Sequence, residues 1–269
     1  MITSATDSPL DDVEFLARSE HRVDALDALA RRPQSRTRLR ELTGVSRSTI
    51  GRTLRELEDR HWIRRDGQQY EATQLGAFVA SGMRDVIGRF ETERKLRDVW
   101  QWLPFEEDGF TIEMALDAVV TVAETDDPYR PINRFESLLR ETDRLRFVGF
   151  DLALLEPCRD ELAQRIVDGM ETEIIDPPSV ARYILTTYPE HCSGPRESGN
   201  LTVRLHDDLP PYGIAIFDRR IAISGHNPES GTVRVLIDTD IPAAREWAES
   251  MYDSCRRESQ PLALETTAE

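Results

Sequence analysis

Residues 39–63 read LRELTGVSRSTIGRTLRELEDRHWI, and the spacing of the apolar side chains predicts two short helices joined by a turn. Leu39 and Leu42 are expected to face inward from the first helix, and Gly44 makes the turn. Ser46 is placed to cap the second helix. That helix carries apolar residues at intervals of four and three, namely Ile50, Leu54 and Leu57. The pattern is typical of a helix-turn-helix.

The flanking residues extend this motif on both sides. Upstream, residues 20–30 place four apolar side chains on one helical face, and Pro33 ends the helix. Downstream, residues 62–73 read WIRRDGQQYEAT, which is two short strands around the turn signal Asp66-Gly67. Three helices followed by a basic hairpin predict a winged helix-turn-helix over residues 1–74.

The charge is concentrated on this motif. Residues 31–66 hold eleven arginines against five acids, a net charge of +6, whereas residues 1–30 carry −5 and residues 67–269 carry −17. The start of a recognition helix faces the major groove, and free backbone N–H groups there favour phosphate. We therefore expect double-stranded DNA as a partner, and a basic helical bundle that binds no DNA is the alternative. The residues expected to contact DNA are Arg36, Ser46, Arg47, Ser48, Thr49, Arg52, Arg55, Arg64, Arg65 and Gln68.

The whole chain is strongly acidic, with a net charge of −16, and Lys95 is its only lysine. This composition resembles proteins of halophiles that accumulate salt, haloarchaea especially. At molar ionic strength the Debye length is ~3 Å, so the net charge does not exclude DNA as a partner. The chain holds no long apolar run, which predicts a cytoplasmic protein that does not enter a membrane. Its three cysteines show no CxxC spacing, so we expect idle thiols, with a redox sensor as the alternative.

The second part of the chain begins with an apolar helical stripe. Residues 75–104 are expected to form a connecting helix, and the stripe of Leu75, Phe78, Val79, Met83, Val86, Ile87 and Phe90 predicts a homodimer. The alternative is that the helix packs only on its own chain. A two-fold dimer would read a two-fold symmetric operator.

Residues 105–258 are expected to form an α/β domain, followed by a flexible tail over residues 259–269. Strands are predicted at residues 119–123, 145–150, 173–176, 201–206, 213–217, 220–224 and 232–237. Helices are predicted at residues 132–142, 154–169, 179–188 and 242–257. The alternating order indicates a partly parallel sheet with an antiparallel portion, so the fold class of the chain is α+β with two domains.

Three stretches of this domain carry a resemblance to a known family. They are VTVAETDDPYRPINRFESLL (residues 120–139), LRFVGFDLALLEP (residues 145–157) and GIAIFDRRIAISGHNPESGTVRVLID (residues 213–238). Together with the winged helix, the chain resembles archaeal winged-helix transcriptional regulators of the haloarchaeal and methanogenesis-regulator type. The resemblance implies an effector domain related to the phospholipase D half-domain, as in TrmB-type regulators.

That implied relation can be tested on the residues themselves. Phospholipase-like enzymes use H-x-K-x(4)-D, and counting back from Asp218 places Pro211 at the histidine position and Gly213 at the lysine position. Proline can neither attack phosphorus nor transfer a proton. We therefore expect a catalytically inactive domain and no enzyme. The alternative, a phosphodiesterase or nuclease with a DNA-docking domain, would need residues that are absent from these two positions.

An inactive domain of this kind is expected to bind an effector, and polar residues at strand ends are the candidates. These candidates are Thr121, Asp151, His206, Asp218, Ser224 and His226. His191 beside Cys192, or His206 near two aspartates, lacks metal-ligand spacing, so neither a metal nor a cofactor is expected. The remaining alternative is an architectural or antitoxin-like protein without an effector.

Overall fold

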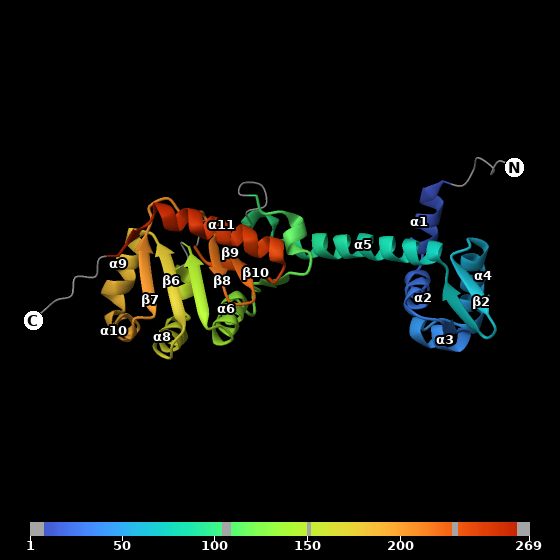
Figure 1. Cartoon of the computed structure of the whole chain (residues 1–269), viewed down its shortest axis with the longest axis horizontal. Coiled ribbons are helices and arrows are strands. Elements are labelled where there is room, and N and C mark those ends of the chain that lie inside the picture. Colours follow the sequence, from blue (N-terminus) through green and yellow to red (C-terminus); the bar gives the residue numbers. More distant parts are fainter. Residues whose placement is uncertain (1–7, 104–108, 150–151, 228–230, 263–269) are drawn as a thin grey trace, which may run out of the picture. The chain divides into compact units, whose positions relative to one another are not determined.

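A computed structural model describes residues 8–103, 109–149, 152–227 and 231–262 of the chain. These residues form two compact units that divide between Glu91 and Thr92. Each unit is described by itself below (Figure 1). No helix of the described ranges is long and apolar enough to cross a membrane.

The N-terminal unit consists of helices and a small antiparallel sheet. Its elements are α1 (Pro9–Ala17), α2 (Glu20–Arg31), β1 (Gln34–Ser35), α3 (Arg36–Thr43), α4 (Arg47–Asp59), β2 (Ile63–Asp66) and β3 (Gln69–Ala72). The three strands pair in the order β1-β3-β2. Gly44 ends α3 with φ +67° and Gly67 turns the β2–β3 hairpin with φ +57°, a region that favours glycine.

One apolar core holds this unit together. Leu39 of α3 and Ile50, Leu54 and Leu57 of α4 are buried in it, as the sequence spacing predicts. The prediction for Leu42 was wrong, because its side chain is 48% exposed. Leu42 lies on the same side of α3 as Leu39, but it is in the last turn of this eight-residue helix, beyond the part that packs on the core.

Helix α5 (Gln74–Arg97) spans the division between the units. It ends earlier than expected, at Arg97, and a short 3-10 turn (Trp100–Trp102) follows it. The predicted apolar stripe separates into two sets. Val79 and Met83 pack on the N-terminal core, whereas five residues of the stripe are exposed by 38% to 80%. Those five are Leu75, Phe78, Val86, Ile87 and Phe90.

The C-terminal unit is built on one eight-stranded mixed sheet. Its strands are β4 (Val119–Val122), β5 (Arg144–Val148), β6 (Glu171–Asp176), β7 (Leu201–Leu205), β8 (Gly213–Ile216), β9 (Ile221–His226), β10 (Val233–Thr239) and β11 (Gln260–Pro261). They lie in the order β11-β7-β6-β5-β8-β9-β10-β4. β5, β6 and β7 are parallel and the other pairings are antiparallel, which confirms the predicted mixed sheet.

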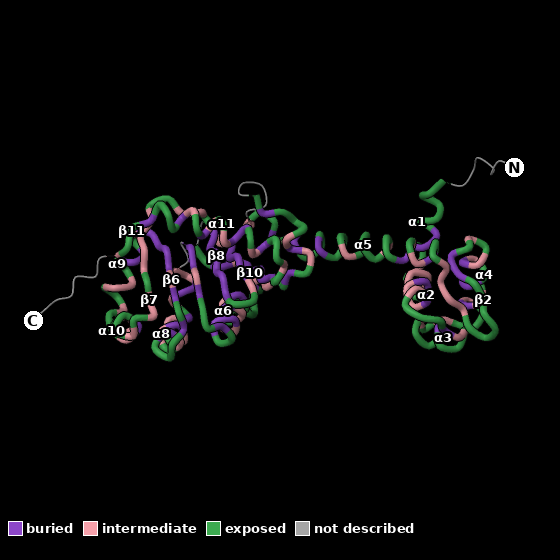
Figure 2. Tube along the Cα trace, viewed as in Figure 1, coloured by how far each residue is buried: buried purple, intermediate pink, exposed green. Residues whose placement is uncertain are grey.

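Helices cover both faces of this sheet. They are α6 (Arg130–Arg140), α7 (Leu152–Leu155), α8 (Arg159–Val167), α9 (Pro178–Thr187), α10 (Pro189–Ser198) and α11 (Pro242–Glu258), with a 3-10 helix at Ile112–Ala115. Neighbouring residues of one strand enter different cores: Val148 packs with α11, and Phe147 packs with α6 and α8. This period of two is what a sheet buried on both faces requires. The buried stretches line the strands in Figure 2.

Three details of this unit differ from the sequence expectation. The helix predicted over residues 154–169 is interrupted between α7 and α8. Helix α10 was not predicted, because its sequence PEHCSGPRES contains glycine and an internal Pro195. The expected tail begins with strand β11, which pairs with β7, and so the start of that segment belongs to the sheet.

Candidate functional site

The start of α4 is organised by Ser46. Its hydroxyl accepts a hydrogen bond from the backbone N–H of Thr49 at 3.2 Å, and it lies 2.8 Å from the Ser48 hydroxyl and 2.9 Å from that of Thr49. The cap leaves other N–H groups of the first turn facing solvent, at the positive end of a 13-residue helix. Such a helix end favours phosphate.

Arginines from three elements line a hollow beside this helix start. Arg36 and Arg40 come from α3, Arg47 from α4 and Arg65 from the hairpin, and together with Gln68 they border a space of about 390 Å³. The Arg36 guanidinium donates to the backbone oxygen of Arg47 at 2.7 Å. A Cβ at Gly51 would lie 2.0 Å from that guanidinium, so this glycine leaves room for Arg36 to cross α4.

The outer face of α4 continues this basic surface. Arg47, Arg52 and Arg55 are exposed. Arg52 lies on the helix face opposite the buried Ile50 and Leu54, whereas Arg47, at the start of the helix, lies on the side of Ile50 and borders the hollow. In the ranges that the structure describes, no carboxylate pairs with any of six exposed arginines, which we call the arginine surface. Its members are Arg36, Arg40, Arg47, Arg52, Arg55 and Arg65.

The two hairpin arginines have different surroundings. Arg64 and Arg65 are consecutive, so they point to opposite faces of β2. Arg64 pairs across the hairpin with Glu71 at 2.5 Å, whereas Arg65 lies over the Tyr70 ring and borders the hollow. Arg64 was grouped with Arg65 in the sequence prediction, and the structure does not bring it to the hollow.

The sequence prediction omitted Arg40 and Tyr70, which also line the hollow. Arg40 lies four residues after Arg36, one helical turn along α3, so helical spacing could have identified it. Tyr70 could not be found this way, because it reaches the hollow through the pairing of β3 with β1 and β2.

The predicted effector residues lie in separate parts of the C-terminal unit. Thr121 and Ser224 flank Leu236 in one row of the sheet. Asp218 lies at the opposite end of β9, where its carboxylate accepts from the backbone N–H of Asp143 at 2.7 Å.

The other candidates are equally dispersed. His226 ends β9, while His206 follows β7 and accepts from the backbone N–H of Asp208 at 3.0 Å. Four strand steps separate β7 from β9, roughly 19 Å at the usual spacing. Asp151 lies outside the described residues. These six residues therefore do not line one pocket, and an effector role for each stays a prediction.

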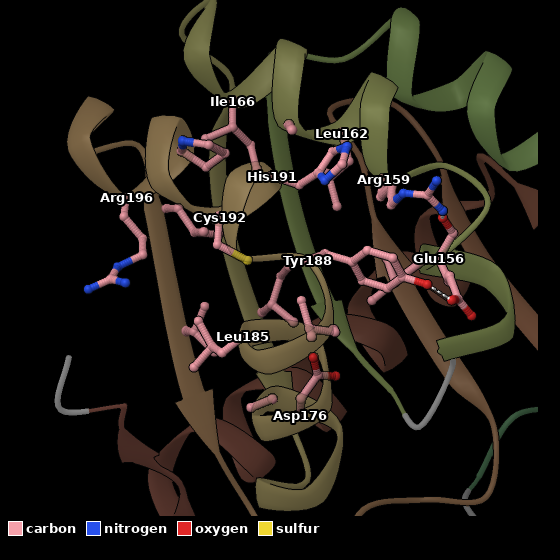
Figure 3. A pocket seen from close by; sticks show the side chains of 18 of the residues that line it. Glu156, Arg159, Leu162, Ile166, Asp176, Leu185, Tyr188, His191, Cys192 and Arg196 are labelled. Atoms are coloured by element: carbon pink, nitrogen blue, oxygen red, sulfur yellow. Dashed lines mark hydrogen bonds between the residues drawn. The ribbon is translucent and has the colours of Figure 1, made fainter.

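A different part of this unit contains an apolar pocket of about 120 Å³. The faces of α8, α9 and α10 enclose it over β6 and β7 (Figure 3). α8 contributes Leu162 and Ile166, and α9 contributes Ile184 and Leu185. The sequence prediction missed this pocket, because its lining is spread over six elements and one of its walls is the unpredicted α10.

Polar groups gather along one wall of the pocket. The Tyr188 hydroxyl donates to the Glu156 carboxylate, and this hydrogen bond raises the pKa of Tyr188 to about 12. The Arg159 guanidinium lies 4.8 Å from the centre of the Tyr188 ring. α10 adds His191, whose Nε2 is 2.8 Å from Asp160, and Cys192, whose pKa is raised by burial. Within the described ranges no three His, Cys, Asp or Glu side chains are grouped as metal ligands would be.

Comparisons with known proteins agree with the division into two units. Residues 10–95 match the family described as the HVO_A0261 N-terminal domain. Residues 128–258 match the family described as the middle domain of the methanogenesis regulatory protein FilR1. No curated protein matches the chain at a significant level.

Similar solved structures include TrmBL2, described as an archaeal chromatin protein with a novel mode of DNA binding. It is 13% identical, with 95% of this chain and 100% of that chain covered and a TM-score of 0.42. NucT from Helicobacter pylori is 15% identical, with 54% and 98% covered and a TM-score of 0.41. Phosphatidylserine synthase from Haemophilus influenzae is 18% identical, with 56% and 41% covered and a TM-score of 0.42.

Proposed function

We propose that this chain regulates transcription by binding double-stranded DNA through the arginine surface. Residues 10–95 match the HVO_A0261 N-terminal domain and residues 128–258 match the middle domain of a methanogenesis regulatory protein, which supports this role. In this proposal α3 and α4 are a helix-turn-helix and the β2–β3 hairpin is a wing. The observation that carries it is the set of six arginines that have no acid partner among the described residues, in a chain of net charge −16.

The positions of these arginines suit two different roles, contact with bases and contact with phosphates. The exposed face of α4 bears Ser48, Arg52 and Arg55, and a helix fits the major groove, where arginine can bond guanine with two hydrogen bonds. Arg36, Arg40 and Arg65 border the hollow beside the helix start, which suits the phosphates that flank a groove. Phosphate contacts fix the position of the protein, and base contacts select the sequence.

Arg52→Ala tests this proposal. The probe is a DNA duplex that the wild-type protein selects from a random pool. The matched control is Arg182→Ala, which changes an exposed arginine of α9. The loss of one base contact is expected to cost ~1–3 kcal/mol, or about 5- to 150-fold in affinity. Equal binding by Arg52→Ala and the control would contradict the assignment of α4.

We further propose that the protein is a homodimer paired through α5. Five large apolar side chains of this helix are exposed, including Phe78 at 80% and Phe90 at 63%, and exposed apolar patches mark interaction surfaces. The double substitution Phe78→Asp/Phe90→Asp is expected to give a folded monomer in light scattering. A wild-type protein that is monomeric at micromolar concentration would rule out the dimer.

The C-terminal unit is proposed to bind a ligand and to catalyse no phosphodiester hydrolysis. Gly213 begins β8 and is buried, and Pro211 precedes it on the surface, so neither position offers a nucleophile or a phosphate-binding amine. Purified protein is expected to leave bis(p-nitrophenyl) phosphate intact. Hydrolysis that disappears in Asp218→Ala would favour the enzyme alternative.

A further inference from the structure

We propose that the pocket enclosed by α8, α9 and α10 is the effector site, and that it binds a small apolar carboxylic acid. This inference rests on the proposed ligand-responsive role of the C-terminal unit. The effector would then bind in this one cavity, and not at the six predicted residues, which are dispersed over the sheet.

Two of the three helices, α8 and α9, line the cavity mainly with apolar side chains. Residues of α8 line it at positions 159, 162, 163 and 166, and those of α9 line it at 181, 184 and 185. Apart from Arg159, these side chains are apolar. An apolar void forgoes packing contacts with its walls, and such a cavity stays dry and accepts apolar molecules. A volume of about 120 Å³ is close to the roughly 150 Å³ of a cavity that holds benzene, so one ring or a short branched chain fits.

The α10 wall is different, because it offers hydrogen-bond donors. His191, Cys192 and Arg196 of α10 line the cavity. Arg196 lies at its edge, with the guanidinium turned outward (Figure 3). Arg196 is exposed and has no ion-pair or hydrogen-bond partner among the residues that the structure describes. Nε2 of His191 lies 2.8 Å from an Asp160 oxygen, so the neutral ring donates there, and its buried Nδ1, which makes no hydrogen bond in the described ranges, can accept one. An amphipathic ligand can therefore place its apolar part among α8 and α9 and its polar part at α10.

The free charge at this wall selects the sign of the ligand. Two carboxylates line the pocket, and both lie away from Arg196 (Figure 3). Glu156 is engaged by the Tyr188 hydroxyl, and the buried Asp176 ends β6. Arg159 donates to the Glu156 backbone oxygen at 3.0 Å, and its Nε lies 3.7 Å from Asp160, beyond hydrogen-bond distance. Arg196 and part of Arg159 thus remain available in a chain that is otherwise strongly acidic. Guanidinium groups bind carboxylates with charge-assisted hydrogen bonds, so an anionic head group is favoured over a neutral or cationic one.

Three probes of one shape but different charge test this inference: benzoate, benzamide and benzamidine. Calorimetry on the full chain is expected to show saturable binding of benzoate, about tenfold tighter than that of the other two. Isovalerate serves as the short branched probe. Cys192 reports the location, because it lines the pocket and the other two cysteines are buried. Bound benzoate is expected to slow its reaction with a thiol reagent.

Two variants complete the experiment. Arg196→Gln is expected to remove the tenfold preference for benzoate, whereas Arg182→Gln, an exposed arginine of α9 that does not line the pocket, is expected to keep it. Ala163→Phe fills the cavity from α8 and is expected to abolish binding without lowering the melting temperature.

The inference is overturned if neither benzoate nor isovalerate binds saturably at millimolar concentration, if benzamidine binds best, or if Arg196→Gln behaves like wild type. Binding to the selected duplex is measured on the same samples. Failure of the wild-type protein to bind DNA would count against the proposed function. If the wild-type protein binds DNA but binds neither benzoate nor isovalerate, the result would count against this site alone.

Discussion

Arginine supplies almost all the positive charge of both units, yet its surroundings differ between them. In the C-terminal unit, Arg134 and Arg220 bind Asp238, a carboxylate with no exposed surface. Arg144 joins Glu171 on the neighbouring strand at 2.5 Å. In the N-terminal unit, the arginine surface has no carboxylate partner in the described part of the chain.

The presence or absence of a carboxylate partner distinguishes arginines that stabilise the fold from arginines that can bind another molecule. In an acidic chain, unpaired arginines that gather on one surface repel each other unless an outside anion binds them. Paired arginines have already satisfied their donors and bring no free charge to a ligand. The C-terminal unit also has exposed arginines without a carboxylate partner in the described part of the chain, among them Arg182, Arg196 and Arg219. Of these three, Arg196 lines the pocket.

The largest effect is expected from charge reversal on the arginine surface. The double variant Arg40→Glu/Arg47→Glu should weaken binding to the selected duplex roughly a thousandfold, because two contacts of ~1–3 kcal/mol each are replaced by repulsion from phosphate. Electrophoretic mobility shifts measure the change. Arg182→Glu/Arg219→Glu makes the same change of net charge on the C-terminal unit. Equal losses in the two variants would mean that net charge, and not this surface, determines binding.

The next effect concerns stability. Asp238→Ala leaves Arg134 and Arg220 without their shared carboxylate, and loss of one partner from a buried ion pair costs about 3 kcal/mol of unfolding free energy. Arg40→Ala, in contrast, should change stability by less than about 0.5 kcal/mol. Urea titration followed by circular dichroism compares them. The comparison between the units fails if Arg40→Ala proves as destabilising as Asp238→Ala.

A smaller effect is expected from salt. Residues 67–269 carry −17, and at ~0.1 M salt a Debye length of ~10 Å leaves much of this repulsion unscreened. The melting temperature should rise by roughly 2–4 °C for each kcal/mol gained between ~0.1 and 2 M KCl. DNA affinity should fall less steeply with KCl than the number of arginines suggests, because cations taken up between acids and phosphates offset counterion release. A flat or falling melting temperature would contradict this account of the charge.

The smallest effect is expected at His21 of α2. Burial lowers the pKa of this imidazole below its usual 6.5, and Arg22 and Arg52 lower it further. Above pH ~6.5 the group is neutral in both states and has no effect on stability. As the pH falls through 6.5 the unfolded chain binds the proton first, so stability falls until the folded pKa is passed. His21→Gln should flatten the stability profile between pH 5 and 7, and an unchanged profile would exclude His21 as the cause.

Local sequence signals predicted much of the fold. The cap at Ser46, the turn at Gly67 and the alternation within the strands each arise from neighbouring residues, and the structure has all three. Features that depend on distant packing could not be found this way. Helix α10 forms against α8 despite Pro195, and the pocket needs residues from β6 to Leu262.

The most direct test of the central claim is an NMR titration of the arginine Nε–H groups in the full chain with the selected duplex. The account predicts that the resonances of Arg36, Arg40, Arg47, Arg52, Arg55 and Arg65 shift, because these side chains bind DNA. Those of the paired Arg134 and Arg220 should stay in place. Shifts that are confined to the C-terminal unit, or spread evenly over both units, would contradict the account.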